Sequence, residues 1–360
     1  MGKRSKRILI GSLAAVLATL FFTAVVNFGW LRGVHSALSH KDAELRFPYQ
    51  QLSKREQALY GTLYHGIENY DETIRLPGIY SKEEYEHVYL MLAMQEPQFF
   101  YLSNIYETAD QMAEANMHYR VEKDQIAVMR SQMDLAADRI LKQADTASGE
   151  MQRMQMIHDG VAALCEYSED SFQSEAYGCL VNGRAKCEGY SKALLYVARR
   201  GGINIMNVPG TIRNGENHVW NVAQIEGKYY NFDVTWDDDE QYRGNVIHSC
   251  FAVPDDLFLD HHPDLTAYRP PTCSDGDRDY YKMNNLTVDS ADALVSMIRT
   301  WPWSGSMLEF RMTSPQVYAA VREKLKSSME VQDAVKLVSG AVNFRATVDE
   351  TRNTIVILPS

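Results

Sequence analysis

A cysteine, a histidine and an aspartate in this sequence have the types and the order needed to break an amide bond by nucleophilic attack. Cys187 is followed by His218 31 residues later and by Asp233 a further 15 residues on. A thiol attacks a carbonyl carbon as the thiolate, an imidazole accepts and returns the proton, and a carboxylate orients the imidazole. The three residues therefore predict a catalytic triad that forms a thioester from an amide.

The pattern around these residues predicts a helix packed on an antiparallel sheet. An amphipathic run begins near Cys187 and ends at Gly201 and Gly202, which are typical of a helix C-terminus. Unpaired N–H groups at a helix N-terminus favour a negative charge, so this position suits a nucleophilic thiol. Short strands are predicted at 203–208, 219–225 and 229–234, the last two joined by a glycine-containing hairpin turn. His218 and Asp233 stand at the ends of this hairpin.

Three linked motifs resemble those of bacterial transglutaminase-like proteins. They are Ala176-Tyr177-Gly178 with Asn182-Gly183 and CEGYSKA at 187–193, then NHVWN at 217–221, then YYNFDVTWDD at 229–238. The resemblance covers about residues 151–262. It implies a papain-like α+β core with Cys187 as the nucleophile, His218 as the base and then the acid, and Asp233 as the orienting carboxylate. It also implies that Tyr177 or a neighbouring backbone N–H holds the oxyanion.

Two tryptophans and a second cysteine accompany these motifs. We expect Trp220 and Trp236 to pack in the core or to line the cleft, where they would bind substrate. Cys179 departs from the pattern of the family, in which a small apolar residue is expected. A disulfide between Cys179 and Cys187 would silence the nucleophile.

We predict neither a metal site nor a cofactor. The cysteines, at positions 165, 179, 187, 250 and 273, include no C-x-x-C pair and no zinc-type spacing with histidine. The acidic run at 237–240 and the nearby Asp255, Asp256, Asp260, His261 and His262 lack the spacing of an EF-hand. We interpret them as a solvated turn and a helix cap. Disulfides among the four cysteines other than Cys187 are permitted if the domain lies outside the cytoplasm.

The N-terminus predicts a membrane anchor. Four basic residues precede an apolar run from Ile8 to about Val26, with Trp30 at its far end. The run is long enough to span a bilayer, and the basic residues before it place the N-terminus in the cytoplasm and the bulk of the chain outside. We therefore expect a single-pass protein of the cell membrane, anchored through residues 8–30. The alternative is secretion after signal cleavage, although no small-x-small cleavage site follows the run.

The predicted fold class is α+β, in five segments. These are a tail and transmembrane anchor (1–30), a polar tether (31–45), a helical domain (46–150), the transglutaminase-like catalytic domain (151–270) and a small α+β domain (280–360). The last segment is predicted to contain helices near 290–299, 315–325 and 331–338, with strands near 308–312, 343–348 and 354–358.

The composition limits the partners. A net charge of -11, with no basic stripe beyond the first residues, argues against nucleic acid. We expect a protein or peptide substrate, with the cell envelope as one candidate source, and a transglutaminase, deamidase or protease outcome; the oligomeric state stays open. One alternative is a catalytically silent binding or scaffold module, because a fold alone does not confer chemistry. Another is a structural envelope protein in which the anchor and helical domain matter most.

Overall fold

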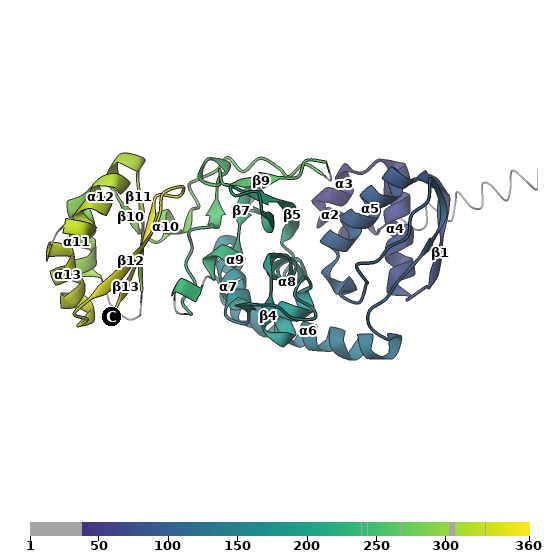
Figure 1. Cartoon of the computed structure of the whole chain (residues 1–360), viewed down its shortest axis with the longest axis horizontal. Helices are drawn as coiled ribbons and strands as arrows, with labels where there is room; N and C mark the ends of the chain where they lie inside the picture. Colours follow the sequence, from purple (N-terminus) through teal and green to yellow (C-terminus); the bar gives the residue numbers. More distant parts are fainter. Residues whose placement is uncertain (1–37, 239, 243, 267, 302–306, 328) are drawn as a thin grey trace, which may run out of the picture. The chain divides into compact units, whose positions relative to one another are not determined.

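The computed structural model describes residues 38–360 except 239, 243, 267, 302–306 and 328 (Figure 1). These residues form two compact units. Most of the first unit is Pro48–Ala93 and Tyr101–Lys123, and most of the second is Asp124–Ser360. The predicted tail and anchor, residues 1–30, lie outside the described residues. Among the residues that are described, no helix is both long enough and apolar enough to cross a membrane.

The first unit combines helices with one β-hairpin. Helix α4 (Lys54–Glu68) begins with a capping box, in which Ser53 and Glu56 each accept a hydrogen bond from the other's backbone N–H. Strand β1 (Thr73–Ser81) packs on α4 where Gly66 has no side chain, since a Cβ there would lie 2.5 Å from Ile74. β1 pairs antiparallel with β2 (Gln111–Asn116). The other helices of this part of the chain are α2 (His40–Glu44), α3 (Phe47–Gln51) and α5 (Lys82–Gln95).

The segment predicted to be a helical domain differs from the structure in two ways. Pro77 and Gly78, predicted to separate helices, lie inside β1, where its pairing with β2 is irregular. Proline is tolerated at such a position because it has no N–H to donate to the ladder. In addition, α6 (Lys123–Ala144) belongs, apart from its first residue, to the second unit.

An antiparallel five-stranded sheet forms the centre of the second unit (Figure 1). In spatial order its strands are β8 (Phe251–Val253), β7 (Lys228–Phe232), β6 (Asn217–Ile225), β5 (Asn204–Ile212) and β9 (His261–Pro263). The predicted hairpin is confirmed as β6 and β7, which are joined through Glu226 and Gly227, both with positive φ.

Helix α8 (Cys187–Arg200) packs on β5 and β6, and every residue from 189 to 198 is buried. The predicted helix from Cys187 to Gly201 is therefore confirmed. Helix α7 (Glu150–Ala162) packs beside α8. The remaining elements near the start of α8 are a parallel pair of short strands, β3 (Glu166–Tyr167) and β4 (Arg184–Ala185), and the π-helix η2 (Gly178–Asn182).

The C-terminal part of the second unit is a four-stranded sheet covered by helices. The strand order is β10 (Thr287–Val288), β11 (Leu308–Met312), β13 (Thr354–Pro359) and β12 (Phe344–Asp349). The helices are α11 (Ala291–Thr300), α12 (Pro315–Ser327) and α13 (Met329–Ser339), preceded by α10 (Tyr280–Met283). The elements predicted for this segment are confirmed.

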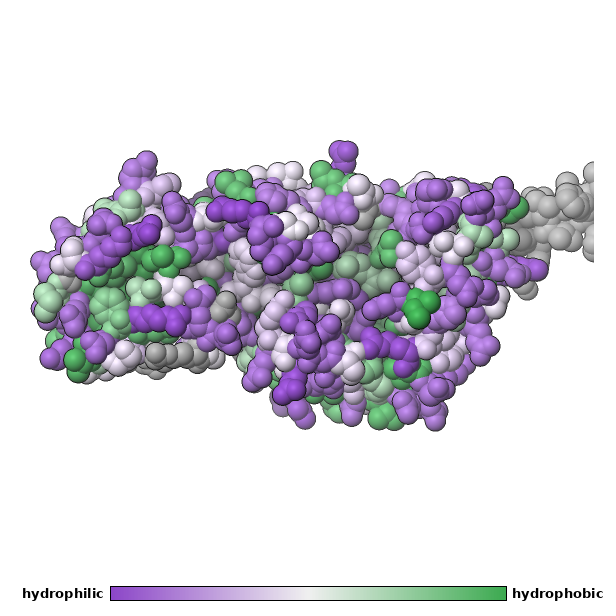
Figure 2. Space-filling view, viewed as in Figure 1, coloured by the Kyte–Doolittle hydropathy of each residue, from purple (hydrophilic) through white to green (hydrophobic). Residues whose placement is uncertain are grey.

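Side chains on β13 also pack against residues that connect β7 to β8 of the five-stranded sheet. Val356 and Leu358 form a buried apolar cluster with Tyr242 and Ile247. The face of the molecule in Figure 2 is mostly hydrophilic, with small apolar areas between the polar groups. The described residues have the predicted α+β class.

Candidate active site

Cys187 is the first residue of α8, and its side chain is half-buried. Lys186 occupies the N-cap position, and its side chain makes no capping hydrogen bond. The N-cap side chain therefore leaves the first-turn N–H groups uncapped, which favours a negative charge at this end of the helix. Gly189 is required in this turn, because a Cβ there would lie 2.4 Å from the carbonyl oxygen of Gln173.

Two hydrogen bonds hold α8 against the strand that carries His218. The Ser191 hydroxyl donates to the carbonyl oxygen of Val219 at 2.7 Å, and the Asn221 amide donates to the carbonyl oxygen of Ser191 at 3.1 Å. Ser191 and Asn221 are both buried. These bonds fix Cys187, one turn before Ser191, relative to His218, which directly precedes Val219.

The His218 imidazole lies between the thiol and a carboxylate. Its Nε2 donates to Asp233 Oδ2 at 2.7 Å, and Cys187 interacts with the same ring and helps to raise its pKa. The other oxygen of Asp233 caps α9 (Val234–Asp237) by accepting from the N–H groups of Thr235 and Trp236. The structure thus brings the three predicted residues together in the order thiol, imidazole, carboxylate.

Electrostatics favour a charged pair of His218 and Asp233. Burial by itself lowers the pKa of His218, but the Asp233 carboxylate and then Cys187 outweigh burial and raise this pKa to about 10. Burial likewise favours a raised pKa for Asp233, but His218 and then His261 outweigh it and hold that pKa well below its usual value. At neutral pH the pair is therefore imidazolium and carboxylate, and an adjacent imidazolium stabilises a thiolate.

A second imidazole, which the sequence did not assign to the site, shares the same carboxylate oxygen. His261 on β9 donates from Nε2 to Asp233 Oδ2 at 3.0 Å and from Nδ1 to Asp260 Oδ1 at 2.9 Å. The interpretation of Asp260 and His261 as part of a solvated turn is wrong, because each is only 6% exposed. Asp237, from the same predicted turn, is fully buried. The burial of Asp237, Asp260 and His261 could not be predicted from the sequence, because the partners of each residue come from distant elements.

The two predicted tryptophans occupy different positions. Trp236 is half-buried, and its ring centre lies 5.8 Å from that of His218 and 4.5 Å from that of His261. Trp220 is 2% exposed and supports the same two imidazoles at 6.4 Å and 5.1 Å. Trp236 is thus placed to contact a substrate, whereas burial gives Trp220 a supporting position. Substrate contact by either residue stays a prediction.

Two tyrosines lie near the start of α8. The Tyr177 hydroxyl donates to Gln132 at 2.8 Å, and its ring stacks on Phe100, so any oxyanion contact by Tyr177 through its backbone stays a prediction. Tyr167 pairs with Ala185 between β3 and β4, and its side chain is half-exposed. Burial first, and then the charge of Cys187, raise the pKa of Tyr167. Sequence reasoning missed Tyr167 because strands of two residues leave no periodic signal.

All five cysteines lie within the described residues and are free thiols. Cys179 is fully buried, and its thiol partner is Cys165 rather than Cys187. Burial first, and then the hydrogen bond with Cys165, raise the pKa of Cys179 well above its usual value. The disulfide with Cys187 that the sequence allowed is not formed in the structure.

Among the described residues, two groups of side chains have donor atoms close enough to share a metal ion. In each, all the donor atoms lie within 4.8 Å of one another; the groups are His158, Asp159 and His248, and His218, Asp233 and His261. Both groups are also connected by direct hydrogen bonds, so a metal would have to displace protons from the imidazoles. A metal in the second group would occupy Nε2 of His218, the nitrogen that holds Asp233.

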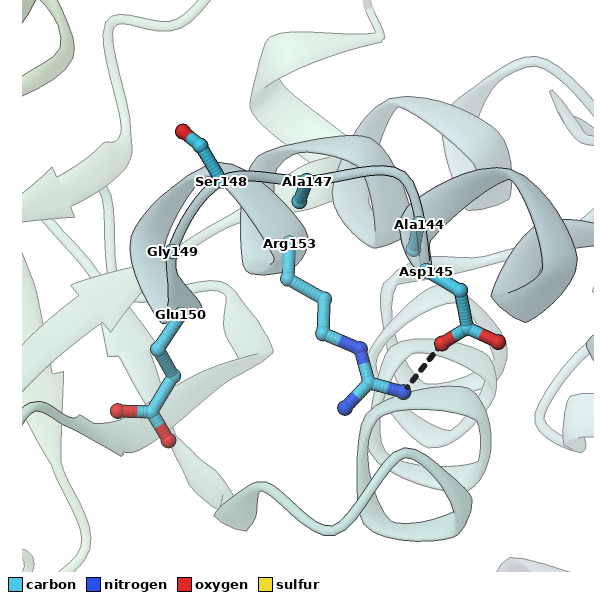
Figure 3. A pocket seen from close by; sticks show the side chains of 7 residues that line it. All are labelled: Ala144, Asp145, Ala147, Ser148, Gly149, Glu150 and Arg153. Carbon is cyan, nitrogen blue, oxygen red and sulfur yellow. Dashed lines mark hydrogen bonds and ion pairs between the residues drawn. The ribbon is translucent and has the colours of Figure 1, made fainter.

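An open hollow of about 410 Å³ lies away from these residues, at the turn between α6 and α7 (Figure 3). It is lined by Ala144, Asp145, Ala147, Ser148, Gly149, Glu150 and Arg153. Arg153 donates to Asp145 at 3.0 Å and to the carbonyl oxygen of Gly201 at 2.7 Å. None of the predicted catalytic residues lines this hollow, so it is not the site of the proposed chemistry.

A thiol at the start of a helix, with a histidine and an aspartate presented by an adjacent antiparallel sheet, defines a papain-like cysteine site. Residues 136–234 match the family model described as the transglutaminase-like superfamily. The chain therefore contains a domain of this superfamily, whose members are usually cysteine enzymes. The matched segment includes Cys187, His218 and Asp233. No curated protein sequence matches the chain.

Three solved structures are similar to parts of the chain. A TGase is 15% identical with a TM-score of 0.29, over 37% of this chain and 43% of the other. A candidate cysteine protease from Cytophaga hutchinsonii is 16% identical with a TM-score of 0.28, over 40% of this chain and 47% of the other. Menin, whose structure reveals the binding site for Mixed Lineage Leukemia protein, is 10% identical with a TM-score of 0.28, over 80% of this chain and 62% of the other. Because these TM-scores are low, the family assignment rests on residues 136–234.

Proposed function

We propose that this protein is a membrane-anchored, extracytoplasmic cysteine enzyme that acts on protein or peptide amides through a thioester. The observation that carries the proposal is the arrangement of a thiol and a carboxylate on either side of one imidazole. His218 binds the Asp233 carboxylate at 2.7 Å on one side and Cys187, at the start of α8, on the other. This is the arrangement that ionises a thiol and supplies a proton to a leaving nitrogen.

His218 transfers each proton of the proposed reaction. The Cys187 thiolate attacks the amide carbon, and the His218 imidazolium protonates the departing nitrogen as the C–N bond breaks. Neutral His218 then accepts a proton from an incoming amine or water, which attacks the thioester and releases the thiolate. Such acid–base catalysis contributes about 10² to 10⁴ in rate, and each oxyanion donor about 10² to 10³.

Two half-exposed aromatic side chains support a peptide substrate. Trp236 lies beside the His218 imidazole, and the Tyr167 side chain interacts with Cys187. Aromatic walls of this kind bind the apolar parts of a peptide while their polar edges remain hydrated. We propose that the scissile amide lies between Trp236 and Tyr167, over the thiol.

The proposed reaction is tested by offering a glutamine-bearing protein together with a fluorescent primary amine. Label incorporation, ammonia release and peptide cleavage are followed in parallel, because transglutaminase, deamidase and protease outcomes share the thioester. At least one product is expected with the wild type, and none with Cys187→Ala or His218→Ala. Product formation that survives Cys187→Ala excludes the thioester route.

A substrate-free measurement separates the enzyme from a silent scaffold. An activated thiol reacts with iodoacetamide at neutral pH faster than an ordinary one, and the rate falls when the base is removed. We expect rapid alkylation of Cys187 in the wild type and slow alkylation in His218→Ala, with Cys187→Ala as the blank. Equally slow alkylation of the wild type and His218→Ala favours the scaffold.

The location of the protein is a separate part of the proposal. The basic residues before the apolar run within residues 8–30 support a single span with the bulk of the chain outside. The full chain is expected in the membrane fraction, and protease added to intact cells is expected to degrade the folded part. A soluble product shortened at its N-terminus instead indicates signal cleavage and secretion.

A further inference from the structure

We propose that the C-terminal segment 280–360 completes the active site, with Arg352 acting as a positioning residue for Asp233 by way of Asp260 and His261. This inference rests on the proposed function and deepens it. Arg352 lies in the turn between β12 and β13, more than a hundred residues beyond Asp233 in the sequence. It also lies outside the matched transglutaminase-like segment, residues 136–234.

A continuous series of hydrogen bonds leads from Arg352 to His218. The Arg352 guanidinium donates from both terminal nitrogens to the two oxygens of Asp260, at 3.1 Å and 2.7 Å. Asp260 accepts from His261 at 2.9 Å, and His261 donates to Asp233 at 3.0 Å. Asp233 then binds His218 at 2.7 Å. The paired geometry of the first link fixes orientation as well as distance.

The shared oxygen of Asp233 makes this series relevant to catalysis. Both imidazoles donate to Oδ2, so the direction of that oxygen is set by His218 and His261 together. Ionised carboxylates only accept hydrogen bonds, so His261 satisfies Asp233 and Asp260 when both its ring nitrogens donate. Without Arg352, the buried charge of Asp260 would lack its guanidinium partner and would compete with Asp233 for the orientation of His261.

Burial makes these interactions strong and their geometry rigid. Arg352 and Asp233 are each 1% exposed. Buried charges are tolerated only when they are paired and hydrogen-bonded. Arg352 meets this condition through Asp260 and through Asp349, whose oxygen it contacts at 2.8 Å. The packing of Val356 and Leu358 on Tyr242 and Ile247 anchors the strand that follows the turn.

Arg352 also supports the aromatic wall beside the imidazole. Its guanidinium lies 4.9 Å from the ring centre of Trp236 and 5.3 Å from that of Phe258. Phe258 in turn stacks on His261 at 3.7 Å. The side chains that bind the Asp233 carboxylate are the imidazoles of His218 from β6 and His261 from β9, and the N–H groups of Thr235 and Trp236 from α9 also donate to it.

The test compares Arg352→Ala and Arg352→Lys with an exposed control in the same segment, Arg322→Ala, in the full chain. The rate of Cys187 alkylation by iodoacetamide and the turnover number are measured as functions of pH. We expect Arg352→Ala to lower both about tenfold and to shift the alkaline limb of the turnover profile, where His218 loses its proton. Arg352→Lys should restore part of the effect, and Arg322→Ala should match the wild type.

A second pair of variants keeps the test decisive if Arg352→Ala unfolds. Asp260→Asn removes the negative charge that Arg352 compensates. In the double variant, Arg352→Ala with Asp260→Asn, no buried carboxylate is left without its guanidinium partner at position 260. Asp260→Asn should also shift the alkaline limb of the turnover profile, and the double variant should be no slower than Asp260→Asn, because the two residues act through one path. A folded Arg352→Ala or Asp260→Asn protein with an unshifted pH profile overturns the inference.

The outcomes also separate this inference from the proposed function. Alkylation needs no amide substrate, so a wild type that reacts rapidly but transfers no acyl group contradicts the function and leaves the Arg352 comparison intact. Conversely, a wild type with Cys187-dependent turnover that Arg352→Ala does not alter contradicts only the positioning role. A lower melting temperature of Arg352→Ala with an unchanged pH profile identifies a merely structural role and likewise overturns the inference.

Discussion

The Ser191 hydroxyl donates a 2.7 Å hydrogen bond to the carbonyl oxygen of Val219. Ser191 lies one turn after Cys187 on α8, and Val219 directly follows His218 on β6. This contact therefore joins the helix of the nucleophile to the strand of the base. Such contacts set the distance between the reacting groups. Small misplacements of reacting groups lower rates sharply.

Replacement of Ser191 by alanine is expected to reduce turnover more than stability. Loss of one hydrogen bond costs about 0.5–1.5 kcal/mol in the free energy of unfolding, while α8 is freed to shift relative to His218. Turnover and urea unfolding measure the two effects. Ser296→Ala is the matched control, since the Ser296 hydroxyl only binds the carbonyl oxygen of Asp292 on the exposed side of α11. Unaltered turnover in Ser191→Ala contradicts the proposed coupling.

Asp233→Asn is expected to lower activity and to narrow its range at alkaline pH. The Asp233 carboxylate is the largest influence that raises the pKa of His218 toward about 10, opposing burial. Without that charge the imidazolium loses its proton at a lower pH, so the alkaline loss of activity moves to lower pH. We expect a decrease of about 10² or more, measured as turnover from pH 5 to 10. An alkaline limb that stays in place would show that another group controls it.

The thermal stability of the folded protein should be greatest in mildly acidic solution. His218 and His248 have folded pKa values of about 10, so their stabilisation is complete below about pH 6.5 and is lost as the pH rises toward 10. Asp233 and Asp159 have lowered folded pKa values, so their contribution is present above about pH 4 and is lost as the pH falls.

The melting temperature is therefore expected to be highest between about pH 4 and 6.5. Differential scanning fluorimetry at constant ionic strength measures this profile. In His218→Ala the decline between pH 6.5 and 10 should be shallower, because one of the two histidines no longer contributes. A melting temperature that increases from pH 6.5 to 9 contradicts the assignment of charged imidazoles.

The two tryptophans should respond differently to truncation. Trp236 is half-buried beside His218, so Trp236→Ala is expected to raise KM while the protein remains folded. Trp220 is 2% exposed, and Trp220→Ala should cost about 3–5 kcal/mol in the free energy of unfolding. Steady-state kinetics and urea unfolding of both variants provide the comparison. An unchanged KM in Trp236→Ala would remove this residue from the substrate site.

Chelation distinguishes thiol chemistry from a metal-dependent reaction at the same residues. If Cys187 is the nucleophile, dialysis against a chelator leaves turnover intact, while iodoacetamide abolishes it. Added Zn²⁺ should inhibit, because a thiolate and imidazoles are good zinc ligands and the metal would displace protons from them. Turnover that is lost on chelation and restored by a metal ion would instead assign catalysis to the group of His218, Asp233 and His261.

The sequence was informative where a short segment determines its own structure. The helix starting at Cys187 is confirmed because an apolar face and a glycine end are local properties. The same holds for the hairpin at Glu226 and Gly227 and for the helices and strands after residue 290. The strand containing Pro77 and Gly78 was missed because its pairing with β2 overrides local preference.

Cys187, His218 and Asp233 were identifiable from their motifs, and the sequence by itself determined these residues and the elements that carry them. Only the tertiary structure decided that His261, Asp260 and Arg352 extend the same network, because each is a polar residue whose sequence neighbours are typical of an ordinary turn. Their burial depends on β9 pairing with β5 and on β13 packing against the loop at 242–247. Contacts between distant segments leave no periodic pattern along the chain. The positions of His261, Asp260 and Arg352 therefore become visible only once the chain is folded.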